Sequence, residues 1–286
     1  MEDKMSKCYS LIPTLLLLLL SVLLLSVLPL QAQETGQKYF EETSRFNAPE
    51  AFQGVGVDEN HFYAVTNQAI GKYEKKTGNL AGQWKGPKDG PIIHLDSAVV
   101  VEGKLYCAHS NYPESPMTSS VEIWDTKTMK HIGTRSFGIH WGSLTWIDRY
   151  NGSWWTVFAN YNQIFGSSQA AYGNTRWTTM VKFDDNWQWQ QAWVLPAKLT
   201  PKFGVMSNSG GSWGPDGLLY LSGHDPAEVY VMKLPEAGSV LEWIDTIPLN
   251  IAGQGIAWDR SDPGTIYGII RSKLQVTSSR LKFKSR

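Results

Sequence analysis

One strand-like segment recurs five times along the chain, and this recurrence restricts the fold more than any other feature. Apolar residues alternate along each copy and polar residues end it; the copies read HFYAVTN, KLYCAHSN, SWWTVFANY, LLYLSGHD and TIYGIIRS. Each copy has an aromatic residue at the matching position, namely Tyr63, Tyr106, Trp155, Tyr220 and Tyr267. Successive aromatic residues lie 43, 49, 65 and 47 residues apart. A repeat of this length indicates an array of similar supersecondary units.

The sequence around each copy completes the unit. A second short strand and a tight turn precede every copy, and turns such as Pro-Asp-Gly and Asp-Pro-Gly supply conformations that reverse a chain within a few residues. A segment typical of a hairpin of two outer strands follows each of the first four copies, for example VEIWDTKTMKHIGTRSFG. Four antiparallel strands per unit are typical of a β-propeller blade.

The number of units predicts an all-β, five-bladed β-propeller. An insertion in the third unit, IFGSSQAAYGNTR, explains the interval of 65 residues. The fifth unit has only three strands before the chain ends, so we expect residues 38–46 to supply the fourth strand and close the ring. The alternative is an open antiparallel sandwich, in which regular repeats of this period are rare.

The first 33 residues have the features of an export signal. Residues 11–30 carry no charge, follow a short head with Lys4 and Lys7, and precede the small residue Ala32. We expect a cleaved signal peptide over residues 1–33 and a single propeller domain over residues 34–286. The alternative is an uncleaved membrane anchor, because 20 uncharged residues are long enough to cross a bilayer. Both interpretations predict a secreted or periplasmic propeller.

The charge balance narrows the class of partner. The chain has 26 Lys+Arg and 26 Asp+Glu residues, and it lacks the basic excess of a nucleic-acid-binding protein. Cys8 lies in the signal segment, so Cys107 is the single cysteine of the exported domain and no disulfide is expected there. We expect a monomer that binds a small molecule, does not bind nucleic acid, and contacts a membrane only if the N-terminal segment stays uncleaved.

The topology of a propeller predicts which polar residues meet. The innermost strand of each blade begins on the face where the second strand ends, so these positions surround the central channel. The candidate catalytic residues there are His94, Asp96, His109, His140, His224 and Asp225. The candidate substrate-binding residues are Gln53, Asn67, Asn111, Trp141, Asn160, Ser209, Gln254 and Arg271. Taken singly, such residues commonly hydrogen-bond nearby loops, but their convergence on one concave face predicts a binding or catalytic site.

These residue types suit acid/base chemistry. Histidine and aspartate can act as general acid and base, and residues 94 and 96 point to the same side of a strand. Arg271 can hold a carboxylate through two parallel hydrogen bonds. A divalent metal is an open alternative, with His94, His109, His140 and His224 as candidate ligands. No cofactor is required by a motif, because zincin, serine-hydrolase, Walker and dinucleotide-binding signatures do not occur.

Other residues are assigned to structure or to the wall of the channel. We expect four tryptophans to pack between blades: Trp146, Trp155, Trp213 and Trp258. We expect four aspartates to form turns on the opposite face: Asp58, Asp148, Asp216 and Asp259. Tyr161 lies at the predicted rim. Trp141 lies there too, beside the loop of residues 109–120, whose Pro113, Pro116 and Met117 can form a wall over the channel.

Several segments together resemble a known family. The sequences QGVGVD, AIGKYEKKTG, LYCAHSNYPESPM, SSVEIWDT, SNSGGSWGPDGLLYLSGHD and GQGIAWD are similar to those of secreted bacterial propeller proteins commonly labelled cycloisomerase, over residues 40–280. The label implies closure of muconate-type diacids into lactones, with an arginine for the substrate carboxylate and a histidine or aspartate for proton transfer. A fainter likeness, in EAFQGV, is to five-bladed glutamine cyclotransferases, although this chain has YAVTN where that family carries a glutamate.

Two classes of function follow. The first is an exported enzyme of the isomerase, lyase or hydrolase type that forms or hydrolyses a lactone, or otherwise acts on a small carboxylate-bearing molecule at the channel mouth. The second is a propeller that binds a ligand or a protein on the same face without catalysis. Acyl transfer of the glutamine cyclotransferase kind is a further alternative.

Overall fold

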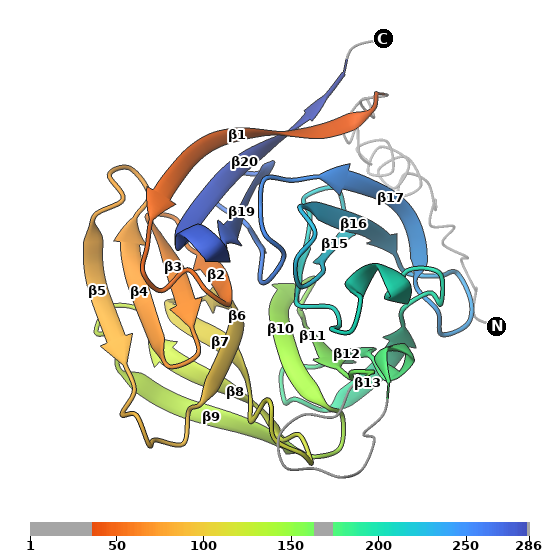
Figure 1. Cartoon of the computed structure of the whole chain (residues 1–286), viewed down its shortest axis with the longest axis horizontal. Coiled ribbons are helices and arrows are strands. Elements are labelled where there is room, and N and C mark those ends of the chain that lie inside the picture. Colours follow the sequence, from red (N-terminus) through yellow and green to blue (C-terminus); the bar gives the residue numbers. More distant parts are fainter. Residues whose placement is uncertain (1–35, 163–173, 285–286) are drawn as a thin grey trace, which may run out of the picture. The chain divides into compact units, whose positions relative to one another are not determined.

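The chain forms a five-bladed β-propeller in the computed structural model, which describes residues 36–162 and 174–284. Five separate sheets of four antiparallel strands surround a central axis (Figure 1). The predicted signal segment, residues 1–33, and residues 164–173 of the predicted insertion lie outside the described residues.

In the first four blades the chain runs from the innermost strand outward. The innermost strands are β2 (Gly54–Val57), β6 (His94–Val101), β10 (Ser143–Tyr150) and β14 (Gly210–Trp213). The second strands are β3 (His61–Thr66), β7 (Lys104–Ser110), β11 (Ser153–Ala159) and β15 (Leu219–Ser222). The third strands are β4 (Ala69–Glu74), β8 (Ser119–Asp125), β12 (Thr179–Phe183) and β16 (Glu228–Lys233). The outer strands are β5 (Leu80–Lys85), β9 (His131–Gly138), β13 (Trp189–Val194) and β17 (Glu242–Pro248).

The two ends of the propeller complete the fifth blade together. Its strand order is β18 (Ala257–Trp258), β19 (Thr265–Ile270), β20 (Gln275–Phe283) and β1 (Lys38–Asn47). β1 pairs antiparallel with β20 from Lys38 opposite Phe283 to Asn47 opposite Gln275, and the two strands run together in Figure 1. The predicted ring closure by an N-terminal strand is therefore confirmed. This pairing covers the edge of β20, which could otherwise pair with another chain, and makes β1 the outer strand of the blade.

Apolar and aromatic side chains fill the space between the blades. The four tryptophans expected there, Trp146, Trp155, Trp213 and Trp258, are all buried. Trp146 also donates its indole N–H to Asn208 Oδ1 at 2.6 Å, so its polar atom is satisfied inside the core. Cys107 is buried and free. Besides strands, the described chain has three short 3-10 helices, η1 (Thr175–Trp177), η2 (Thr200–Phe203) and η3 (Arg271–Lys273), and none of these is long and apolar enough to cross a membrane.

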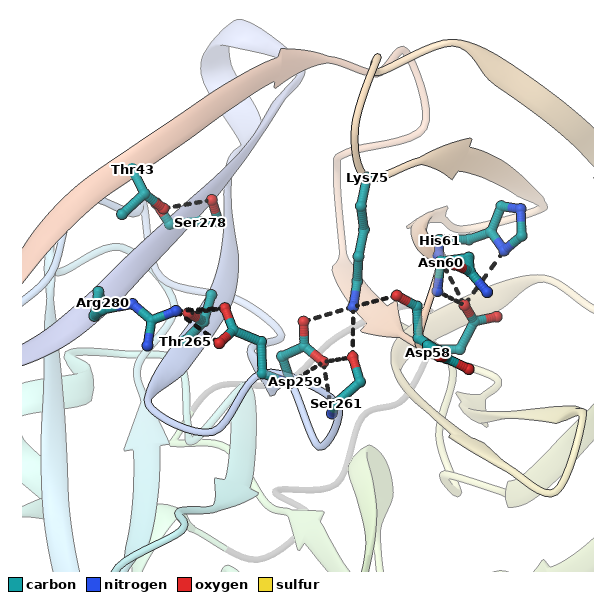
Figure 2. A network of polar contacts seen from close by, with 12 residues as sticks. Thr43, Asp58, Asn60, His61, Lys75, Asp259, Ser261, Thr265, Ser278 and Arg280 are labelled. Carbon is teal, nitrogen blue, oxygen red and sulfur yellow. Dashed lines mark hydrogen bonds and ion pairs between the residues drawn. The ribbon is translucent and has the colours of Figure 1, made fainter.

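Aspartates organise the turns on the face where the innermost strands end. Asp58 accepts hydrogen bonds from the backbone N–H groups of Asn60 and His61, as Figure 2 shows. Asp216 and Asp259 cap their turns in the same way. Asp148 is different, because it is buried and accepts from the Trp213 N–H and from Arg260 of blade five. This carboxylate therefore links blades in addition to serving its own turn.

Candidate functional site

A cavity of about 250 Å³ opens on the face where the innermost strands begin. All five blades contribute to its wall: Phe52, Gln53, Asn67, His94, Asp96, Tyr112, Pro113, Thr145, Tyr161, Met206, Ser209, His224, Gln254 and Arg271. Eight of the fourteen residues proposed for the site line this cavity, and they are Gln53, Asn67, His94, Asp96, Ser209, His224, Gln254 and Arg271. Asp225 does not line the cavity, but its carboxylate is hydrogen-bonded to His224, which does.

Backbone contact at the propeller axis closes the bottom of the cavity. A Cβ atom on Gly255 would lie 2.8 Å from Gly54 Cα, and one on Gly54 would lie 2.9 Å from Ser97 Cα. Only glycine allows neighbouring strands to approach this closely. Beyond this contact the axis holds a void of about 10 Å³. The site is consequently a cup that opens on one face.

His224 and Arg271 form a pair in the wall supplied by blades four and five. Arg271 Nη1 donates to His224 Nε2 at 3.0 Å, and His224 Nδ1 lies 2.7 Å from Asp225 Oδ2. A guanidinium has donors only, so Nε2 must accept and the ring proton is on Nδ1, where Asp225 receives it. The guanidinium also lies over the Phe52 ring at 4.3 Å, which fixes its plane.

His94 and Asp96 form the second ionisable pair, on β6. Both side chains are nearly buried, and His94 Nε2 lies 3.6 Å from Asp96 Oδ2. Burial lowers the pKa of His94 to about 4, and charges on His109 and Arg271 act in the same direction. Burial raises the pKa of Asp96 well above its usual range, against the opposing effect of Arg271. Burial thus favours the uncharged form of each group, and the protonated form of the Asp96 carboxyl would be a proton donor in the cavity.

The two glutamines both line the cavity and tie the wall together. Gln53 Nε2 donates to Asn67 Oδ1 at 2.6 Å within blade one. Gln254 Nε2 donates to the His224 carbonyl at 3.4 Å, between blades five and four. Both amides therefore face the cavity while holding its wall, Gln53 within blade one and Gln254 between two blades.

Six of the predicted residues lie outside the cavity, and the five besides Asp225 have other contacts. His109 Nε2 accepts from the Ile93 N–H at 3.2 Å and its Nδ1 lies 2.8 Å from Ser120 Oγ, so both ring nitrogens are used within blade two. His140 is exposed, and Trp141 stacks on Phe158 at 5.7 Å. Asn111 orders its own loop through the Pro116 carbonyl and the Thr118 N–H, and Asn160 donates to the Trp141 carbonyl.

The structure adds wall residues that the sequence did not single out as site residues. Pro113 and Tyr161, expected near the channel, do line it, and the additions are Phe52, Tyr112, Thr145 and Met206. Tyr112 packs against His94 at 4.8 Å and brings the loop of residues 109–120 over the cavity. Little in the sequence points to Thr145 as a cavity residue, because it lies inside a strand and not at its end. Regular alternation of side chains along the strand would place it between blades, and only the irregular pairing of β10 with β11 turns it toward the cavity.

The candidate histidines are not gathered around one point. Within residues 36–162 and 174–284, no three His, Cys, Asp or Glu side chains come together as a group that could hold a metal ion. His94 and His224 line the cavity, whereas His109 and His140 do not.

A larger hollow, of about 570 Å³, lies on the opposite face between blades one and five. Three of its charged side chains, Lys75, Asp259 and Asp262, are held in ion pairs. Lys75 Nζ contacts Asp259 Oδ2 at 2.5 Å and also Ser261 Oγ at 3.1 Å, as Figure 2 shows. Asp262 pairs with Arg280. Paired charges of this kind stabilise the blade junction. The smaller cavity is therefore the better candidate for chemistry.

Comparison with known proteins supports the fold. No protein-family model and no curated protein sequence matches the chain. Among solved structures, the PQQ-bound aldose sugar dehydrogenase from Streptomyces coelicolor is similar with a TM-score of 0.51 and 8% identity, over 86% of this chain and 99% of that one. A streptogramin B lyase has a TM-score of 0.44 at 12% identity, over 86% and 98% of the two chains. The WD40 repeats of RRP9 have a TM-score of 0.45 at 11% identity, over 80% and 79%. At 8% identity the match to the dehydrogenase supports the propeller fold alone.

Proposed function

We propose that this chain is an exported propeller enzyme that acts on a small carboxylate-bearing molecule in the central cavity, forming or opening a lactone-type ring. The observation that supports this most is the adjacency of Arg271 and His224, 3.0 Å apart in the cavity wall. A guanidinium can bind the carboxylate of a small molecule, and a neighbouring imidazole that is oriented by a carboxylate can exchange a proton with another atom of that molecule.

The chemistry needs no oxidant or reductant. In ring closure, a carboxylate oxygen adds to a carbon–carbon double bond of the same molecule, and the neighbouring carbon takes a proton. In lactone hydrolysis, water adds to the ring carbonyl, the ring C–O bond breaks, and the departing oxygen takes a proton. Arg271 would bind the carboxylate, His224 would accept or return the proton, and the buried Asp96 carboxyl would donate one.

A turnover assay tests the proposal. Purified protein is incubated with cis,cis-muconate and with a series of five- and six-membered lactones, and products are followed by NMR. We expect conversion of at least one compound by the native protein, loss of at least 100-fold in His224→Ala and in Asp96→Asn, and native activity in His140→Ala. Saturable binding without any product would contradict the enzymatic proposal and favour a binding propeller.

Export and oligomeric state are part of the same proposal. We propose cleavage near residue 33 and a monomeric exported domain. Amino-terminal sequencing of the protein from the extracytoplasmic fraction should begin near residue 34, and size exclusion should give the mass of one chain. A membrane-bound full-length chain would instead indicate the uncleaved anchor.

A further inference from the structure

The innermost strands of two neighbouring blades are irregular at the residue that faces the cavity. In β6, the pairing with β7 shifts between Leu95 and Ala98. In β10, the pairing with β11 shifts between Leu144 and Trp146. The described pairs of innermost and second strands in the other three blades are regular. Bulges re-aim side chains and are common next to functional sites.

The bulges present two buried polar groups to the cavity. Asp96 and Thr145 both line it, and each is only 4% exposed. Neither Asp96 Oδ2 nor Thr145 Oγ1 has a hydrogen-bond partner among the described residues. Buried polar atoms are normally paired, because an unpaired one loses its hydration without compensation. A ligand that hydrogen-bonds both groups would recover this loss.

The opposite part of the wall has the complementary chemistry. Blades four and five supply His224 and Arg271, and Arg271 offers donors only. Blade one lies between the two parts, and its Gln53 and Asn67 bond to each other. The cavity thus has one side for an anion, on blades four and five, and another side for a hydroxyl-like group, on blades two and three.

We infer that the cavity binds a small hydroxy carboxylate, with the carboxylate on Arg271 and the hydroxyl between Asp96 and Thr145. This inference rests on the site of the proposed function and names its ligand class. A hydroxyl both donates and accepts, so it matches a neutral carboxyl and a threonine hydroxyl. An ammonium group has donors only, so it could not accept from the Thr145 hydroxyl or from a neutral carboxyl. The volume of about 250 Å³ limits the ligand to a small molecule.

The inference also selects among the reactions. Hydrolysis of a lactone yields one carboxylate and one hydroxyl on the same molecule, which are the two groups that the cavity accommodates. Cyclisation of an unsaturated diacid involves no hydroxyl. The hydroxy carboxylate is therefore the product of ring opening, or the substrate of the reverse reaction.

Equilibrium binding, without turnover, tests the inference. Calorimetry compares 2-, 3- and 4-hydroxybutyrate with butyrate and 4-aminobutyrate on the purified full chain. We expect at least one hydroxybutyrate to bind at least 10-fold more tightly than butyrate, because a site built for a hydroxyl rejects the analogue that lacks it. Equal affinity for butyrate, tighter binding of 4-aminobutyrate, or no binding of any hydroxybutyrate would overturn the inference.

Matched variants separate this inference from the proposed function. In Thr145→Val and in Asp96→Leu, which keep the approximate side-chain shape and remove the polar atoms, the preference for the hydroxybutyrate should fall at least 5-fold while butyrate binding stays the same. Arg271→Ala should weaken both ligands, and the exposed Arg135→Ala should weaken neither. An unchanged preference in both Thr145→Val and Asp96→Leu would overturn the assignment of the hydroxyl. A preference for the hydroxybutyrate in a protein that shows no turnover would leave the inference standing and contradict the enzymatic proposal.

Discussion

Arg271 of blade five donates to His224 of blade four, and this hydrogen bond occupies Nε2, the acceptor nitrogen of the His224 ring. A carboxylate would compete for the same guanidinium with stronger, charge-assisted hydrogen bonds. Binding of a carboxylate would therefore release Nε2 toward the ligand. Under the proposed function, the pair would couple recognition of the anion to exposure of the base.

This coupling predicts the effect of changes at Arg271. Arg271→Ala should raise KM for a carboxylate substrate by about 10- to 100-fold, because the charge-assisted contact is lost. Arg271→Lys should recover only part of it, since an ammonium lacks the planar fork of donors. Steady-state kinetics measures KM in both Arg271 variants and in Arg135→Ala, an exposed control whose KM should equal that of the native protein. An unchanged KM in Arg271→Ala would contradict the placement of the carboxylate.

His94 predicts how stability depends on pH. Its pKa is lowered from 6.5 to about 4 by burial, so the folded protein resists protonation of a group that the unfolded chain protonates. The contribution of His94 to stability is then complete above pH 6.5 and is lost as the pH falls toward 4, by about 2 kcal/mol at pH 5. His109, whose pKa is also lowered by burial, adds loss in the same direction. Asp96, whose pKa is raised by burial, contributes in the opposite direction.

Denaturant unfolding at pH 7 and pH 5 measures this loss. In His94→Gln the difference between the two pH values should shrink by about 2 kcal/mol, whatever the change in absolute stability. In His140→Gln, where the side chain is exposed, the difference should equal that of the native protein. If the free energy of unfolding fell equally between pH 7 and pH 5 in the native protein and in His94→Gln, then His94 would not be the responsible group.

The sequence was sufficient for the fold because its repeats carry the needed signals. Tyr63, Tyr106 and their counterparts mark the second strand of each blade, and the incomplete fifth unit implies the pairing of β1 with β20. Topology then placed Gln53, His94 and Arg271 around one mouth. These inferences need only strand order and strand direction.

The details of the site depend on features that strand order does not contain. Thr145 faces the cavity through a bulge, and a one-residue change of register moves a side chain to the other face of a sheet. His109 lies at a strand end as expected, but the Ile93 N–H and Ser120 hold its ring within the blade. His140 follows the end of β9 and stays exposed. Such contacts depend on local geometry that alternation of residues cannot reveal.

The ring closure can be tested at β1. Phe40 points inward from this strand and packs against Trp258 at 5.9 Å and Tyr220 at 6.4 Å, whereas its neighbour Tyr39 is exposed. Phe40→Ala should lower the free energy of unfolding by about 2 kcal/mol, because apolar contact with two buried rings is lost. Tyr39→Ala should change it by less than about 0.5 kcal/mol. If both substitutions changed the free energy of unfolding by the same small amount, Phe40 of β1 would not be packed against the blades that it joins.

Contact between glycines at the axis predicts the effect of a single methyl group. A Cβ on Gly255 would lie 2.8 Å from Gly54 Cα and 2.9 Å from Ser97 Cβ, so Gly255→Ala must push backbone apart beneath the cavity. We expect a loss of about 2 to 3 kcal/mol in unfolding free energy, the range of a forced overpacking. The floor of the cavity should move as well, so binding of a small carboxylate should weaken.

Gly133 on the outer strand β9 provides the matched control. A Cβ there would have its nearest neighbour, Ile123 Cδ1, at 3.7 Å, which is ordinary contact. Gly133→Ala should therefore leave stability within about 0.5 kcal/mol of the native protein and leave binding unchanged. If Gly255→Ala were as stable as Gly133→Ala, the blades could not be in the close contact that closes the cup. The cavity would then extend along the axis, and its limit on ligand size would no longer hold.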